Sequence, residues 1–386
     1  MTTSFDFQPR TRIVFGINST KRIGPLASEL PARRVLLVTD PGIVTAGHAD
    51  RVRKSLEQAG IPVRLFDRVI ENPTTRTVDE CVAVARDAHI DAIIGLGGGS
   101  SMDTAKGCNF LLTSGGRMQD YRGVGKATRP MLPLIAIPTT AGTGSECQSF
   151  ALIVDETTHQ KMPCGDPKAA ARIAILDPTL TLTQPRHVAA AAGIDAVAHA
   201  VETAVTKKRN AISWLFSREA FRLTVTNLPI VLEHPDDIEA RAAMQLGAAY
   251  GGIAIEHSML GAAHSAANPL TARHGIVHGV AVGRMLPHVV RFNAQDPAAA
   301  RAYAELAQFA GLASLGDADQ RAVEALIGRL DHLLDAAELP RSLSVDRVTP
   351  AALQALAEEA ARQWTAQFNP RAVTVQDFVA LYEAAL

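Results

Sequence analysis

The stretch AIIGLGGGSSMD (92–103) joins two kinds of local structure directly. Its apolar, partly β-branched start is typical of a buried strand, the glycines end that strand, and the residues after them open a helix. At such a turn the backbone N–H groups and the positive end of the helix dipole face an anion, and glycine lets a phosphate approach the main chain. A tight structural turn would use the same glycines, so the flanking sequence has to decide between the two.

Strand and helix patterns alternate on both sides of this stretch. We expect strands at the apolar runs and helices at the amphipathic segments between them: strands at 10–16, 34–40, 61–67, 92–99 and 132–140, and helices at 48–60 and 77–90. This alternation predicts a parallel sheet with helices on both faces, a Rossmann-like α/β fold.

The sequence pattern changes after Pro185. From there to the end the chain is alanine-rich with a period near 3.6, which predicts an all-helical region, with Thr183 as a candidate N-cap of its first helix. We therefore predict an α/β domain over 1–184 and an all-helical domain over 185–386. Small ligands usually bind in clefts between such domains.

Composition excludes several classes of function. The chain has 386 residues, 47% of them hydrophobic, and a net charge of −1, so it carries no electrostatic footprint for nucleic acid or an anionic membrane. Neither a secretory signal nor an apolar run long enough to span a bilayer is present, and the four cysteines have no CxxC spacing. We expect a cytoplasmic protein with reduced cysteines and a small-molecule ligand.

A cofactor site is predicted at the carboxyl ends of the strands, where open α/β sheets bind their ligands. A second glycine-bearing turn, PTTAGTGSE (138–146), follows the next strand, and Asp40 ends the first. The acidic residue of the usual dinucleotide fingerprint lies about 20 positions after the glycines, whereas Asp40 precedes them, so the standard motif is not matched. A carboxylate facing the ribose would repel a 2′-phosphate and favour NAD over NADP.

A metal site is suggested by GIDAVAHAVE (193–202), in which Asp195 and His199 leave the same face of a helix. Taken alone, such a spacing is more simply explained by a hydrogen bond between the two side chains on one helix than by a metal site. The segment HSAANPLTARHGIVHG (264–279) adds His264 and His278 across a turn containing proline and glycine. One carboxylate and three imidazoles suit Fe²⁺ or Zn²⁺, and such a centre is a Lewis acid that can stabilise an alkoxide.

Together these motifs resemble the iron-dependent alcohol dehydrogenase family over essentially the whole chain. The matching segments are GGGSSMDTAKG (97–107), LPLIAIPTTAGTGSE (132–146), ILDP (175–178), AGIDAVAHAVE (192–202), the His264 to His278 pair, LPHVVRFN (286–293) and NPRAVT (369–374). The resemblance implies reversible hydride transfer between NAD and a small alcohol or aldehyde, and a homodimer or higher oligomer. It implies that 1–184 is a dinucleotide-binding domain and that 185–386 is a metal- and substrate-binding domain, in which Asp195, His199, His264 and His278 hold the metal. It implies that the residues around the cofactor are Asn72, Gly98, Gly99, Ser100, Asp103, Thr139, Thr140, Thr143, Lys161 and Leu180.

The chain departs from the family pattern at one position. Members commonly carry a second histidine four residues after the third metal ligand, where this chain has Asn268. An amide can hydrogen-bond a ribose hydroxyl but cannot exchange protons near neutral pH. Either His257 or a water held by Asn268 is therefore expected to take over proton transfer.

Four alternatives to an alcohol dehydrogenase have to be weighed. A zinc glycerol dehydrogenase-like polyol oxidoreductase and a dehydroquinate synthase share the two-domain plan, and Ala262, Ala263, Ala266 and Phe150 suggest a pocket too apolar for the latter. The intact Asp-His₃ set argues against a maleylacetate reductase. A non-catalytic nucleotide- and metal-binding homologue is favoured only by Asn268.

Overall fold

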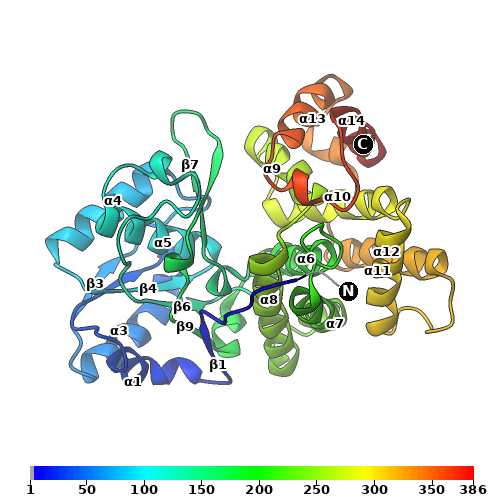
Figure 1. Ribbon diagram of the computed structural model, residues 1–386. Coiled ribbons are helices and arrows are strands. Elements are labelled where there is room, and N and C mark those ends of the chain that lie inside the picture. Colours follow the sequence, from blue (N-terminus) through cyan, green and yellow to red (C-terminus); the bar gives the residue numbers. More distant parts are fainter. Residues whose placement is uncertain (1–3) are drawn as a thin grey trace. The chain divides into compact units, whose positions relative to one another are not determined.

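The α/β unit is built on a six-stranded parallel sheet (Figure 1). The computed structural model describes residues 4–386. The strand order of this sheet is β1-β9-β6-β4-β2-β3. The strands are β1 Arg12–Phe15, β2 Val35–Val38, β3 Val63–Phe66, β4 Ala92–Gly97, β6 Leu134–Pro138 and β9 Ile173–Leu176. The predicted Rossmann-like parallel sheet is confirmed.

Register brings the predicted cofactor turns to one edge of this sheet. Val38 of β2 pairs with Gly95 of β4, and Gly97 of β4 pairs with Pro138 of β6. Since these strands are parallel, the residues that follow them emerge side by side at their carboxyl ends.

Helices cover both faces of the sheet because successive strand residues point to opposite sides. Leu37 and Ile94 pack into one core with α1 and α3, and Leu36 and Ile93 pack into a second core with α4 and α5. These helices, together with the short α2, are α1 Ile23–Ser28, α2 Pro41–Thr45, α3 His48–Gln58, α4 Thr75–Asp87 and α5 Gly99–Ser114.

A small second sheet of this unit was not expected from the sequence. Strand β8 (Lys161–Gly165) pairs antiparallel with β7 (Phe150–Val154) and parallel with the short β5 (Gly123–Val124). Alternate residues of β7 are buried, and β8 contains Pro163, which weakens its strand signal.

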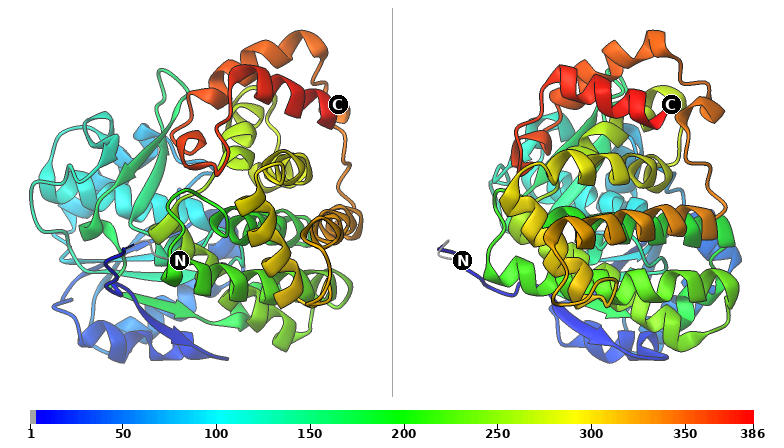
Figure 2. Two further views of the ribbon diagram at one scale, coloured as in Figure 1. Left: turned by 45° about the vertical axis from the view of Figure 1, so that its right-hand side comes forward. Right: turned by 90° about the vertical axis from the view of Figure 1, so that its right-hand side faces the viewer.

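The helical unit contains Pro185–Leu386, the segment Ala141–Thr143 and the N-terminal segment that ends at Phe7 (Figure 2). Its helices are α6 Arg186–Thr203, α7 Ala211–Glu233, α8 Ile238–Ser258, α9 Ala262–His274, α10 His278–Asn293, α11 Pro297–Phe309, α12 Asp319–Ala336, α13 Leu353–Ala361 and α14 Val375–Ala385. The N-cap of α6 is Pro185, so the expectation for Thr183 is wrong; its hydroxyl instead donates to the carbonyl of Leu180.

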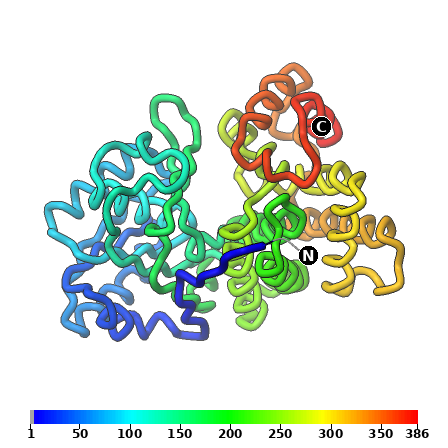
Figure 3. Tube along the Cα trace, viewed as in Figure 1, coloured from blue at the N-terminus to red at the C-terminus, as the bar shows by residue number. Residues whose placement is uncertain are grey.

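Helix α6 packs against α7, α8 and α10, and glycines allow the close approaches. A Cβ on Gly193 would lie 2.3 Å from Leu228, and one on Gly279 of α10 would lie 2.0 Å from the carbonyl oxygen of Ala191. The trace in Figure 3 shows the C-terminal helices α13 and α14 folded back on the same unit, where α13 contacts α9 and α14 contacts α10. The helices that carry the predicted ligands are thus held at close range.

The four cysteines are free and buried. Among residues 4–386, no helix is both long and apolar enough to cross a membrane.

Candidate metal centre and cofactor site

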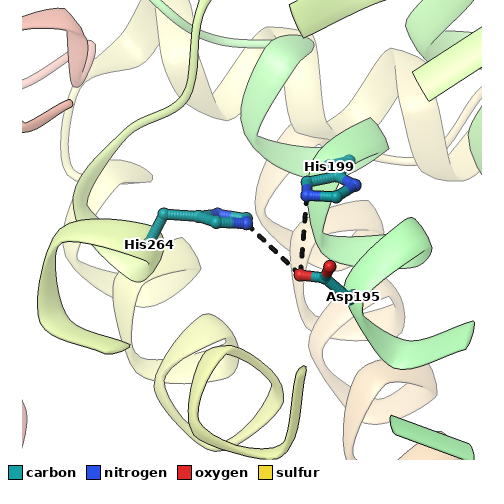
Figure 4. Close-up of side chains that lie close together, drawn as sticks. All are labelled: Asp195, His199 and His264. Carbon is teal, nitrogen blue, oxygen red and sulfur yellow. Dashed lines mark ion pairs between the residues drawn. The ribbon is translucent and has the colours of Figure 1, made fainter. Parts of the chain in front are cut away.

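Three of the predicted ligands converge inside the helical unit (Figure 4). From Oδ1 of Asp195, the distance to Nε2 of His199 is 3.5 Å and that to Nε2 of His264 is 3.3 Å. The two imidazole rings are stacked with centroids 4.9 Å apart. All three side chains are buried.

These separations are those of ligands that share one ion. Nitrogen and oxygen ligands lie about 2.1 Å from Fe²⁺ or Zn²⁺, so two of them in a tetrahedral site are about 3.4 Å apart. Oδ1 of Asp195 and Nε2 of His264 are buried and have no hydrogen-bond partner among the described residues. Buried polar atoms are normally satisfied, so this pair fits a cation that both would bind.

His278, the fourth predicted ligand, lies at the margin of the cluster. Its Nε2 is 4.0 Å from Oδ1 of Asp195, its ring centroid is 5.4 Å from that of His264, and its side chain is 25% exposed. It is the first residue of α10, and Gly279 beside it allows that helix end to meet α6. His278 therefore occupies the more open side of the cluster.

Charge in the cluster favours an ionised carboxylate. Burial acts to raise the pKa of Asp195, but the three histidines outweigh it and hold this pKa well below its ordinary value. Burial lowers the pKa of His199 despite Asp195. For His264 the effect of burial is overcome by Glu202 and Asp195, which raise its pKa to about 9.

The polypeptide positions these groups by simple means. Asp195 and His199 are one turn apart on α6 and leave the same face. His264 lies in the first turn of α9. The predicted Pro/Gly turn between His264 and His278 is only partly right, because Pro269 lies inside α9 and the turn begins at Gly275.

The predicted cofactor residues that follow β2, β4 and β6 lie close together in the α/β unit. Asp40 caps α2, accepting from the amide of Ile43 at 3.1 Å, and its Oδ2 would be 3.2 Å from a Cβ on Gly97. Thr140 faces Gly98, the N-cap of α5, and the amide of Thr139 donates to the carbonyl of Gly97 at 3.0 Å. A carboxylate thus adjoins the glycine turn, as the ribose contact requires.

A second group of predicted residues is joined by hydrogen bonds. The backbone N–H of Asn72 donates to Oγ of Ser100 at 3.2 Å. Nζ of Lys161 donates to the side-chain Oδ1 of Asn72 at 3.1 Å. Asn72 has a φ of 52°, in the left-handed region that asparagine tolerates. These three side chains, from three separate segments, border the start of α5.

Behind the glycine turns lies a buried ionic cluster. Nζ of Lys106, on α5, donates to the carbonyl and Oγ of Ser145 at 2.7 and 2.9 Å and to the carbonyl of Phe150 at 2.9 Å. Burial raises the pKa of Asp103 to about 6 and that of Glu146 to about 7, although Lys106 opposes both shifts. Asp103, expected beside the pyrophosphate, accepts from Oγ of Ser145 at 3.4 Å.

The remaining predicted residues are less closely tied to these groups. Leu180 is buried in the core beneath the sheet, and Thr143 belongs to the segment that packs with the helical unit. Asn268 donates from Nδ2 to Oε1 of Gln363 at 3.1 Å. The ring of His257 packs edge-on against Phe7 at 4.9 Å between centroids, so its role in proton transfer stays a prediction.

The suggested apolar pocket needs a correction. Ala262, Ala263 and Ala266 are fully buried in the hydrophobic core of the helical unit and are core residues. They belong to this core because residues 262–267 at the start of α9 are all buried, which the sequence alone did not reveal.

Sequence reasoning also missed two buried charged groups. Glu202 lies within the quoted stretch 193–202 and hydrogen-bonds His264. Its spacing, three residues after His199 on the same helix, was the available signal. Lys106 lies in the quoted stretch 97–107 but had no spacing pattern to distinguish it from a solvated lysine.

An α/β unit with glycine turns at its strand ends, followed by a helical unit with a carboxylate–imidazole cluster, is the arrangement expected of a metal-dependent dehydrogenase. Comparison with known proteins gives the family. Residues 9–178 match the model of the iron-containing alcohol dehydrogenase family, and 189–386 match that of the C-terminal region of Fe-containing alcohol dehydrogenases. The chain belongs to the iron-containing alcohol dehydrogenase family and is an oxidoreductase of this type.

Individual relatives agree over full length. The chain is 33% identical to the NAD-dependent methanol dehydrogenase of Bacillus methanolicus, covering 100% of both chains. It is 33% identical to the choline dehydrogenase of Bacillus subtilis, covering 98% of this chain and 94% of the relative. The crystal structure of a 1,3-propanediol oxidoreductase superposes with a TM-score of 0.96 at 31% identity, covering 100% of both chains.

Proposed function

We propose that this protein interconverts a small primary alcohol and its aldehyde, using NAD and one divalent cation. The observation that carries the proposal is the convergence of Asp195, His199 and His264 at the spacing of metal ligands, with buried atoms left for the ion. The named activities of the relatives above, toward methanol, choline and 1,3-propanediol, support a small alcohol as substrate.

The metal we propose is Fe²⁺, with Zn²⁺ as the alternative, held by Asp195, His199, His264 and His278. When bound, it supplies a Lewis acid that lowers the pKa of the substrate hydroxyl. Asp195 contributes the one negative charge among the four ligands, and His278 closes the exposed side of the site.

For NAD we propose a site at the glycine turns of the α/β unit. Gly98, Gly99 and Ser100 at the start of α5 would bind the pyrophosphate through backbone amides, as helix N-termini do. Asp40 would accept hydrogen bonds from the ribose and disfavour a 2′-phosphate. The other residues proposed around the cofactor are Asn72, Asp103, Thr139, Thr140, Thr143, Lys161 and Leu180.

Proton transfer is proposed to pass through His257 or through a water held by Asn268. Because Nδ2 of Asn268 donates to Gln363, its Oδ1 is the atom oriented to accept from a water or a hydroxyl. A His257→Ala variant with full turnover and an unchanged pH profile would eliminate the histidine route.

We also propose a homodimer formed through β1. This strand ends the sheet on one side, and Phe15, its last residue, and Ile17, just after it, are exposed. Exposed edge strands with apolar side chains are sites of strand pairing.

The test is NADH formation by metal-loaded protein. The chain is freed of metal, loaded anaerobically with Fe²⁺ or Zn²⁺, and mixed with NAD and methanol, choline, 1,3-propanediol or glycerol, while the NADH absorbance band is followed. We expect metal-dependent reduction of NAD to NADH with methanol, choline or 1,3-propanediol, or with more than one of them. Protein that binds metal and NAD but gives no signal with alcohols, or with aldehydes and NADH, would favour the non-catalytic alternative.

A further inference from the structure

Glu202 is a buried carboxylate at the C-terminal end of α6, only 2% exposed. It lies one turn beyond His199 and faces the N-terminus of α9, the helix that carries His264. Ionised carboxylates are rarely buried so fully unless they are paired.

Each oxygen of this carboxylate accepts from a different donor. Oε2 accepts from Nδ1 of His264 at 2.5 Å, and Oε1 accepts from the backbone amide of Ala263 at 2.7 Å. A proton fixed on Nδ1 leaves Nε2 as the atom of His264 that faces Asp195, 3.3 Å away. Glu202 thereby selects which nitrogen of the ring is presented to the centre.

Asn369 completes this arrangement from the C-terminal segment. Its Oδ1 accepts from the amide of Ala262 at 3.2 Å and from Nδ2 of Asn293 at 3.1 Å. A Cβ at Gly261 would lie 2.9 Å from Oδ1 of Asn369 and 3.1 Å from Oε1 of Glu202. The first amides of α9, which no intrahelical bond can satisfy, are thus divided between two buried side chains.

We infer that Glu202 is a positioning residue for the metal: it holds the ring of His264 with Nε2 directed at the ion. The inference rests on the proposed function, since it assigns a role toward the ion proposed there. Carboxylates that accept from the second nitrogen of a ligating histidine act in this way, and their loss costs about 10- to 100-fold in metal affinity. The competing explanation is that Glu202 only caps α9.

The variants Glu202→Gln and Asn369→Ala together separate the two roles. In glutamine an NH2 group replaces one of the two carboxylate oxygens, so this side chain meets either Nδ1 of His264 or the backbone amide of Ala263 with a donor. The backbone cap can also be removed elsewhere, because Asn369→Ala deletes the acceptor of Ala262 without touching His264. Glu219→Gln is the matched control, since this partly exposed carboxylate pairs with Arg222 on the surface of α7.

The experiment measures Co²⁺ binding to the metal-free full-length variants by chelator competition, with the visible Co²⁺ spectrum as a report of ligand geometry. For Glu202→Gln we expect an affinity loss of about 10- to 100-fold and an altered spectrum. Asn369→Ala should lower the thermal midpoint of the metal-free protein, while its Co²⁺ spectrum stays as in the unmodified chain. Glu219→Gln should change neither the thermal midpoint nor the Co²⁺ spectrum.

Two results would overturn the inference: Glu202→Gln binding Co²⁺ as tightly as the unmodified chain with the same spectrum, or Asn369→Ala showing the same affinity loss and altered spectrum as Glu202→Gln. If Glu202→Gln does not fold, Glu202→Asp decides alone, because it keeps the charge but is one methylene short of His264. Unmodified protein that binds Co²⁺ with the expected variant response but oxidises no alcohol would refute the dehydrogenase proposal and leave this inference intact.

Discussion

Gly279→Ala tests whether the close approach of α10 to α6 builds the fourth side of the metal centre. The added Cβ would lie 2.0 Å from the carbonyl oxygen of Ala191 and 3.2 Å from Cβ of Asp195. An ordinary carbon–oxygen contact is about 3.3 Å, so the start of α10 must retreat from α6 by more than about 1 Å. The obstacle is backbone, which cannot rotate aside as a side chain could.

This retreat exceeds what the site can absorb. Nε2 of His278 is already 4.0 Å from Oδ1 of Asp195. Two ligands with bonds of about 2.1 Å cannot share an ion beyond a separation of about 4.2 Å. We expect His278 to be lost as a ligand, with metal affinity falling about 10- to 100-fold and the free energy of unfolding falling by about 1–3 kcal/mol from overpacking.

The assay is chelator competition for bound metal, together with chemical unfolding of the metal-free protein. Gly328→Ala is the matched control, because a Cβ at this exposed position of α12 meets nothing within 4 Å. It should leave metal affinity unchanged and stabilise the helix by up to about 1 kcal/mol. Gly279→Ala protein with unchanged metal affinity and stability would show that the approach of α10 does not position His278.

Four further predictions follow from the two sites. His264→Ala should abolish metal retention and alcohol oxidation while NAD affinity, measured by calorimetry, stays within about twofold; an active, metal-free variant would contradict the centre. Asp40→Ser should reduce the kcat/KM preference for NAD over NADP by about tenfold, or about 1.4 kcal/mol, and an unchanged ratio would place the carboxylate away from the ribose. Asn268→His should add an ionisation near pH 6.5 to the kcat profile, and a superimposable profile would remove position 268 from the proton route. Burial raises the pKa of Glu146 from 4.5 to about 7, so between these pH values the folded state keeps a proton that the unfolded chain has lost, and the stability of the fold falls as pH rises through this range. Glu146→Gln should therefore raise the thermal midpoint more at pH 8 than at pH 5. An equal change at the two pH values would mean that Glu146 does not titrate between them.

The parallel sheet was predictable because its four inner strands, β2, β4, β6 and β9, are buried on both faces. The segments around Leu37 and Ile94 are continuous apolar runs that end at glycine or aspartate, and such runs fit few other structures. The small sheet was not predictable in the same way, since β7 is only half buried and Pro163 interrupts the pattern of β8.

Residue types and helix periodicity were enough to propose Asp195 and His199 as a pair, since both lie on one helix. Spacing could not show how α9 and α10 would approach α6, which depends on Gly279 and on the buried acceptors around Gly261. It also could not distinguish the core alanines of α9 from a pocket wall, because both call for small apolar side chains. Tertiary packing decides these questions.

The burial of Lys106 makes its chemical modification a measure of unfolding of the α/β unit. Its ammonium group is enclosed by two carbonyl oxygens and a hydroxyl, so an amine-directed acylating reagent cannot reach it while the α/β unit is folded. Surface lysines would react within the dead time of such an experiment, whereas acylation at position 106, read by peptide mass, would proceed only as often as α5 separates from its neighbours. The rate of that single modification would report how often this half of the chain opens, and no cofactor is needed to read it.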